Sequence, residues 1–70
     1  MAVTRGSFND GNNTEILTAT GADAALLDAL PDPGRQSDDS LGRWSMKLGG
    51  GKYIVPFEVI KNVLNLVPKP

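Results

Sequence analysis

The residue types that most often carry catalysis or bind metal ions are scarce in this chain. Its 70 residues include no histidine and no cysteine, which leaves carboxylates and backbone oxygens as metal ligands. No serine or lysine stands in a pattern typical of a nucleophile beside its base, so acid–base chemistry would fall to carboxylates in loop-like segments. We therefore expect no enzyme activity, no metal site and no cofactor.

The run Gly49-Gly50-Gly51-Lys52 has the residue types of a phosphate-binding loop, in which backbone amides hold phosphate and a lysine reaches its oxygens. The full motif requires a glycine where Met46 stands and a serine or threonine where Tyr53 stands. Three successive glycines also suit a tight turn, because glycine readily adopts a positive φ angle. We interpret the run as the turn of a β-hairpin.

Two adjacent acids, Asp38 and Asp39, could suggest a cation site. They lack the alternating acidic spacing and the central glycine of a calcium-binding loop. We interpret them as solvated side chains of a polar linker loop at residues 31–42, which begins with the turn-forming run Pro31-Asp32-Pro33-Gly34.

Three cations, Arg43, Lys47 and Lys52, flank two aromatic residues and form a candidate anion-binding set. Cations contact phosphate and aromatic rings stack on bases, so the set suits a nucleic acid or another anionic ligand. However, strand alternation places Trp44 on the face opposite Arg43 and Lys47, and the chain is acidic overall. Binding of nucleic acid by this basic hairpin face is therefore the alternative function.

The net charge of −1 conceals an asymmetry along the chain. Residues 1–39 hold seven acids and two bases, a net charge of −5, whereas residues 40–70 hold one acid and five bases, a net charge of +4. Two explanations remain open. Either the charges are solvated or balanced between the two halves, or the basic half meets an acidic partner surface or a polyanion.

The large apolar residues gather between residues 43 and 67, and the rest of the chain must position or cover this segment. In its first part Trp44, Met46 and Leu48 alternate with polar residues, which predicts a half-buried strand at about 43–48. The β-branched and aromatic residues at about 52–55 predict a second strand, joined to the first across the glycine turn.

A C-terminal amphipathic helix is predicted at about 56–67. Pro56 suits the first position of a helix, where the missing amide hydrogen would be unpaired in any case. Apolar residues then recur at steps of three and four, at Phe57, Ile60, Val63, Leu64 and Val67. Val59 and Leu66 lie outside this stripe and widen the apolar surface beyond what a small hairpin can cover.

A shorter helix is predicted at about 21–30. Thr20 has the residue type of a helix cap, Asp23 suits the positive end of the helix dipole, and Pro31 ends the element. The residues that fall on one apolar face are Ala22, Ala25, Leu26, Ala29 and Leu30. Such a short helix is marginal alone, so it must find cover on the hairpin or the last helix.

The N-terminal residues 1–13 have loop composition, with Phe8 as a single apolar anchor, and predict an irregular arm that is flexible or bound to a partner. Residues 15–20 have β propensity and predict one edge strand. Residues 14–70 then form a single small α+β domain.

The function expected is that of a non-enzymatic structural or accessory module, a small subunit of a larger assembly such as a virion component. A protein partner is expected, either another copy of the chain or a different chain, because the last helix has more apolar surface than the chain can cover. The expected partner-binding residues are Phe8, Trp44, Phe57, Val59, Ile60, Val63, Leu64, Leu66 and Val67. The sequence has no signal peptide and no apolar run near the roughly 20 residues of a membrane span, so a location inside a cell or a virus particle is the default expectation.

Overall fold

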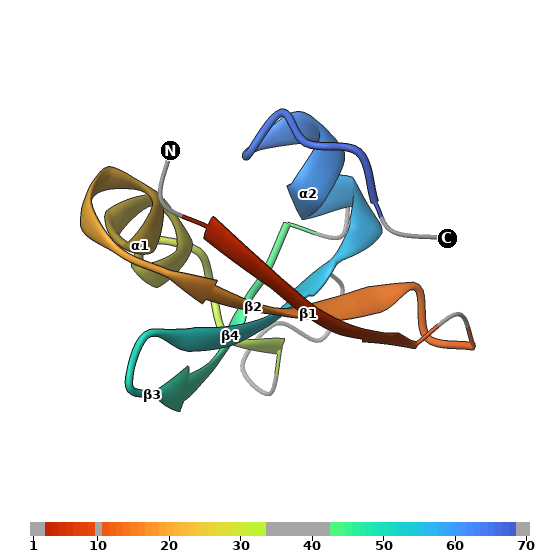
Figure 1. Ribbon diagram of the computed structural model, residues 1–70, viewed down its shortest axis with the longest axis horizontal. Coiled ribbons are helices and arrows are strands. Elements are labelled where there is room, and N and C mark those ends of the chain that lie inside the picture. The colour runs from red at the N-terminus through yellow and green to blue at the C-terminus, as the bar shows by residue number, and fades with distance from the viewer. Residues whose placement is uncertain (1–2, 10, 34–42, 69–70) are drawn as a thin grey trace.

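The computed structural model describes residues 3–9, 11–33 and 43–68, and it has the α+β architecture that the sequence predicts (Figure 1). The chain forms two successive strand–strand–helix units. The first unit contains β1 (Val3–Asn9), β2 (Thr14–Ala19) and α1 (Gly21–Asp28). The second contains β3 (Met46–Gly49), β4 (Lys52–Pro56) and α2 (Phe57–Asn62).

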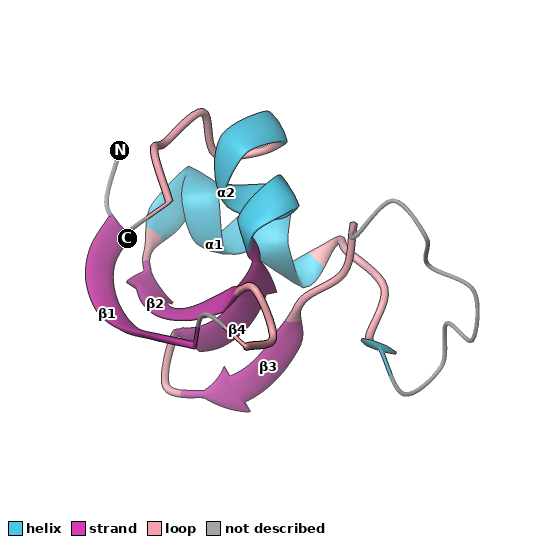
Figure 2. Cartoon of the chain, turned by 90° about the vertical axis from the view of Figure 1, so that its right-hand side faces the viewer, coloured by secondary structure: helices cyan, strands magenta, loops and turns pink. Residues whose placement is uncertain are grey.

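The four strands form one antiparallel sheet in the order β1-β2-β4-β3. The second strand of each unit therefore lies at the centre, where Ile16 pairs with Ile54 in the middle of the β2–β4 register. Both helices lie on the same side of the curved sheet (Figure 2). We call this covered side the inner face and the opposite side the outer face.

The prediction of an irregular N-terminal arm is wrong, because residues 3–9 form strand β1 and pair with β2. Gly6 and Ser7, which gave this segment its loop-like composition, lie where the register between the strands shifts. Such an irregularity accommodates a residue without ending the strand. A Cβ atom on Gly6 would lie 2.4 Å from the carbonyl oxygen of Ile16, so the close approach of the two strands requires glycine.

Strand β2 is present close to its predicted position, but it is a central strand and not an edge strand. Strand β1 pairs with one edge of β2, and β4 pairs with the other. The sequence pattern did not predict β1, so β2 was expected at an edge. Alternate residues of β2 are fully buried on the inner face, namely Glu15, Leu17 and Ala19. A polar residue at one of these positions therefore needs a partner inside the domain.

The predicted hairpin is confirmed, with strands β3 and β4 joined through the glycine run. Gly49, Gly50 and Gly51 all have positive φ angles, of 88°, 63° and 79°. Residues with side chains rarely adopt such angles, which explains why three glycines stand together here. Strand β3 is shorter than predicted and begins at Met46.

The core lies between the inner face and the two helices. Its buried residues come from β2, α1, β4 and the α2 region: Leu17, Ala19, Leu27, Tyr53, Val55, Val59, Ile60 and Leu64. The last helix therefore finds its cover within the same chain, on the sheet that β1 and β2 enlarge.

Helix α2 ends earlier than predicted, at Asn62 in place of residue 67. Asn65 adopts a positive φ angle of 55°, a conformation that asparagine tolerates better than most residues and that is incompatible with a continuing helix. The amides of Leu64 and Leu66 then donate to the carbonyl oxygens of Val59 and Ile60, at 3.0 and 2.8 Å. The chain thus folds back over its own helix and still buries Leu64.

Helix α1 has its predicted extent within two residues, but the predicted apolar face is wrong. Leu27 and Asp23 are buried, whereas Leu26 is 47% exposed, and Ala22, Ala25 and Ala29 are also exposed. Alanines lie all round this helix, so the apolar pattern alone does not fix its rotation. Thr20 is the residue before the helix, as predicted, but among the described residues its side chain makes no capping hydrogen bond.

The acids Asp38 and Asp39 and most of the predicted linker lie outside the described residues. In the part of the chain that the structure describes, no helix is long and apolar enough to cross a membrane.

Candidate functional site

The start of strand β3 turns its polar side chains toward the helices. The hydroxyl of Ser45, which is fully buried, donates to the carbonyl oxygen of Leu27 at 2.7 Å. The ammonium of Lys47 donates to the carbonyl oxygen of Leu30. Carbonyl groups in the last turn of a helix lack the usual helical partner, and the carbonyl of Leu27 also accepts from the amide of Leu30 at 3.2 Å. Ser45 and Lys47 therefore add donors at the C-terminal end of α1.

The alternating apolar residues of the same segment consequently face outward. Met46, Ile54 and Ile16 are paired side by side across β3, β4 and β2, and they form one row on the outer face. Met46 is 38% exposed, and Ile16 and Ile54 are half-buried. Both described helices lie on the opposite side of the sheet (Figure 2), so neither covers this row.

A hollow of about 700 Å³ lies over this row, and we call it the outer hollow. Residues from all four strands and from the turn after β1 line it. The apolar lining residues are Phe8, Ile16, Trp44, Met46 and Ile54, and the polar ones are Ser7, Asn9, Asn12 and Thr14. Glu15 also lines the hollow, but its carboxylate is fully buried in an ion pair with Arg5 on the inner face. Apolar walls with a few polar groups at the margin are typical of surfaces that bind other molecules.

Trp44 also lines a second, more polar hollow of about 530 Å³, together with Asn12, Phe57, Glu58 and Lys61 among others. Trp44 and Asn12 are common to both hollows, so they lie where the two meet. Because this tryptophan is the only one in the chain, its fluorescence reports on ligands at either hollow.

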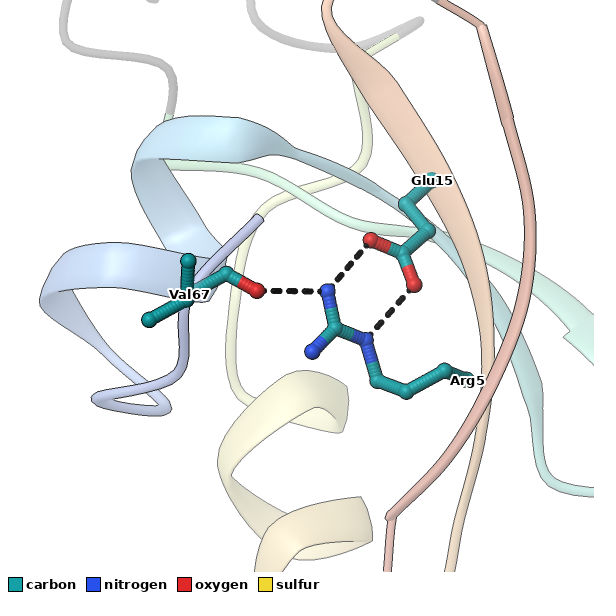
Figure 3. A network of polar contacts seen from close by, with 3 residues as sticks. All are labelled: Arg5, Glu15 and Val67. Atoms are coloured by element: carbon teal, nitrogen blue, oxygen red, sulfur yellow. Dashed lines mark hydrogen bonds and ion pairs between the residues drawn. The ribbon is translucent and has the colours of Figure 1, made fainter. Parts of the chain in front are cut away.

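On the inner face, a buried ion pair joins the first two strands to the end of the chain (Figure 3). Two nitrogens of Arg5 donate to the two carboxylate oxygens of Glu15, both at 2.7 Å. The guanidinium also donates to the carbonyl oxygen of Val67 at 2.7 Å. The side chain of Glu15 is fully buried and that of Arg5 is 26% exposed.

The hydrogen bonds to Glu15 raise the pKa of Arg5 above its ordinary value, and the charge of Glu15 adds to this while burial opposes it. Arg5 therefore stays charged, as its partner requires. This geometry satisfies the carboxylate and holds the C-terminal segment against β1, so we assign the pair to structure and not to catalysis.

A second polar contact on the inner face joins β4 to α1. The hydroxyl of Tyr53 donates to a carboxylate oxygen of Asp28 at 2.8 Å. This bond first, and then burial, raises the pKa of Tyr53 above its ordinary value. With Ser45 and Lys47, Tyr53 fixes the rotation of α1 that its apolar pattern left open.

The predicted partner-binding residues fall into two groups. Val59, Ile60 and Leu64 are at most 1% exposed and belong to the chain's own core, so the folded chain does not offer them to a partner. Phe57, Val63 and Leu66 are half-buried against that core.

The remaining three partner-binding residues are accessible. Phe8 is 40% exposed and Val67 is 81% exposed, while Trp44 is half-buried. The outer hollow brings Phe8 and Trp44 together, but Val67 is not among its lining residues.

The three candidate anion-binding residues do not form one patch. Lys47 points to the inner face and binds the carbonyl oxygen of Leu30, whereas Lys52, which pairs with Thr18, lies on the outer face. Arg43 lies before β3 and is exposed.

Sequence reasoning missed Met46, Ile54 and Ile16 as site residues. The alternation identified both faces of the hairpin correctly but not which one is buried. The available signal was the polar set Ser45 and Lys47, since a helix end that needs hydrogen-bond donors can attract them to the inner face.

The described residues contain no group of three or more histidine, cysteine, aspartate or glutamate side chains that could hold a metal ion. Comparisons of the chain with protein-family models, curated proteins and solved structures each gave no match.

Proposed function

We propose that this chain is a non-enzymatic interaction module that acts as a small structural or accessory subunit of a larger assembly, for example a virion component. The observation that supports the proposal most strongly is the outer hollow, where Met46, Ile54 and Ile16 form an apolar row that neither described helix covers. Contiguous exposed apolar surface on a small domain often marks a binding site for another protein.

None of the three residues of this row belongs to the buried core that the structure describes. The core is complete on the inner face, where both helices cover the sheet. Burying Met46 and its neighbours against a partner would therefore add stabilisation that the isolated chain lacks, at about 25 cal/mol per Å² of apolar surface removed from water.

The alternative function, binding of nucleic acid or another anion, has weaker support. Lys47 is engaged at the end of α1, and its ammonium lies on the face opposite Lys52. The hairpin thus does not gather the cations that such a ligand requires.

The test uses the variant Met46→Asp and the matched control Leu26→Asp. Both residues are exposed, but Leu26 lies on α1 and does not line the outer hollow. Tagged chains would be crosslinked in the native source and analysed quantitatively by mass spectrometry, and each purified chain would be examined by sedimentation.

We expect the wild-type chain and the Leu26→Asp variant to share a protein neighbour or to self-associate, and the Met46→Asp variant to lose that association while keeping its fold. A wild-type chain that stays monomeric at high concentration, and whose crosslinked neighbours are unchanged by Met46→Asp, would contradict the proposal.

A further inference from the structure

The two edges of the sheet are poorly suited to bind an extended peptide through its backbone. At β3, the chain itself occupies part of the edge, because the amide of Ser45 donates to the carbonyl oxygen of Pro31 at 3.1 Å. At β1, the register shift between Arg5 and Phe8 makes the strand irregular near its middle. Addition of a strand needs a continuous ladder of backbone hydrogen bonds, so a partner must recognise the outer face through side chains.

The size of the outer face favours a single element over a second copy of the whole domain. Four strands at a spacing of about 4.8 Å, with strands about 17–20 Å long, give a face of roughly 350 Å². A stable protein complex buries about 800 Å² on each partner. One helix, about 10 Å wide, fits a face of this size.

The sheet is already covered by helices on its inner face (Figure 2). The outer row offers a second, smaller apolar surface, with Met46, Ile54 and Ile16 side by side across three strands. Side chains at i, i+3, i+4 and i+7 of an amphipathic helix can contact such a row.

The charge of the outer face selects among such helices. Among the described residues at outward positions of the four strands, Lys52 is the only charged one. It is exposed and lies two positions from Ile54 on the same strand, beside the middle of the row. An acidic side chain on the partner would meet a cation there and no anion.

We propose that the outer hollow binds one amphipathic helix of a partner protein, with its apolar side on the row Met46–Ile54–Ile16 and an acidic residue beside Lys52. The proposal rests on the proposed function and specifies the class of partner.

The probe is a synthetic helical peptide of about 14 residues, long enough to span the face at 1.5 Å per residue, closed by a side-chain staple. It carries leucines at i, i+3, i+4 and i+7 and glutamates at its ends. One control peptide carries lysines in place of the glutamates, and a second has a central proline that breaks the helix. Trp44 fluorescence measures affinity, and methyl NMR signals of Ile16 and Ile54 locate the peptide.

We expect the acidic helix to bind with shifts at Ile16 and Ile54, and the other two peptides to bind more weakly. Met46→Asp should weaken binding by about tenfold or more, as for a central interface residue, and Leu26→Asp should leave it unchanged. Lys52→Glu should reverse the preference between the acidic and the basic helix.

Failure of the acidic helix to bind, or equal binding of the proline-containing peptide, would overturn the proposal that the partner is a helix. So would dimerisation of the chain through the same face, seen as Ile16 and Ile54 shifts that depend on protein concentration alone. If Met46→Asp still abolishes association in the native source, the proposed function as an interaction module stands, and only the proposal of a helical partner is wrong. If neither experiment shows association, both proposals fail.

Discussion

On the inner face of the sheet, the segment that enters β3 presents the polar side chains of Ser45 and Lys47, whereas its outer face presents Trp44 and Met46. Hydrophobicity alone favours the opposite arrangement. The polar side chains are inside because the end of α1 leaves carbonyl groups there that need donors, and an unsatisfied buried polar group costs about 1–3 kcal/mol. The inner face thus places polar donors where the fold needs them, and the apolar side chains of the same segment face outward.

The largest effect is expected where a buried charge would lose its partner on the inner face. Glu15→Gln should lower the free energy of unfolding by about 3 kcal/mol, because it leaves the Arg5 guanidinium with an uncharged neighbour. Urea denaturation measures the change. Glu58→Gln is the control, since the Glu58–Lys61 pair at 3.8 Å is more than half exposed and should contribute about 0.5 kcal/mol or less. Equal effects of the two substitutions would contradict the structural role of the buried pair.

A smaller loss is expected where β1 approaches β2. In Gly6→Ala the new methyl group would lie 2.4 Å from a backbone oxygen of Ile16, so the strands must shift, at a cost of about 1–3 kcal/mol. In Gly11→Ala the nearest atom is the side-chain oxygen of Asn9 at 3.3 Å, which can move. Thermal unfolding of the two variants should therefore differ, and equal midpoints would show that β1 does not pair as described.

The comparison between the two faces can be tested with adjacent residues. Ser45→Ala makes the inner face more apolar but should destabilise by about 1 kcal/mol, because the carbonyl of Leu27 loses the shorter of its two hydrogen bonds and keeps only the one from the amide of Leu30 at 3.2 Å. Met46→Ser makes the outer face more polar and should change stability by only about 0.5 kcal/mol. Chemical denaturation of both variants measures the order of the effects. The reverse order would mean that the faces are assigned wrongly.

The smallest effect is expected at high pH. The raised pKa of Tyr53 means that the fold favours the neutral phenol. Its contribution to stability is therefore complete below the unfolded pKa of about 10 and is lost as the pH rises through the higher folded pKa. Tyr53→Phe should lose about 1 kcal/mol at neutral pH and decline less steeply above pH 10 than the wild type.

Tyr53 is the only tyrosine in the chain, so tyrosinate absorbance follows its titration directly. A titration midpoint at or below the ordinary value for tyrosine would contradict the bond to Asp28.

Local patterns predicted part of this fold. The glycine turn, the hairpin and both helices follow from residue types at short spacing, as does the α+β class. Strand β1 did not, because Gly6 and Ser7 have loop composition and serve a strand only through their contact with β2. The rotation of α1 also depends on distant partners, since Ser45 and Tyr53 select Leu27 over the adjacent Leu26.

The candidate site was predicted in part for the same reason. Phe8 and Trp44 were expected on a partner surface and do line the outer hollow. Val59, Ile60 and Leu64 were assigned to that surface as well, because without β1 the sheet seemed too small to cover α2. The prediction that the cations share one face of the hairpin did not anticipate the contact of Lys47. Its ammonium binds the carbonyl oxygen of Leu30, which lies 17 positions earlier in the chain at the end of a helix.

The order of the strands also has a consequence for how fast the chain folds. The β3–β4 hairpin pairs residues close in sequence, such as Lys47 and Tyr53, whereas the central β2–β4 ladder pairs Glu15 with Val55, 40 positions away. Closing a long loop costs conformational entropy before the contacts that reward it form. We therefore expect the joining of the two strand–strand–helix units to limit the folding rate. The pair Ile16–Ile54 lies at the middle of the ladder that joins them.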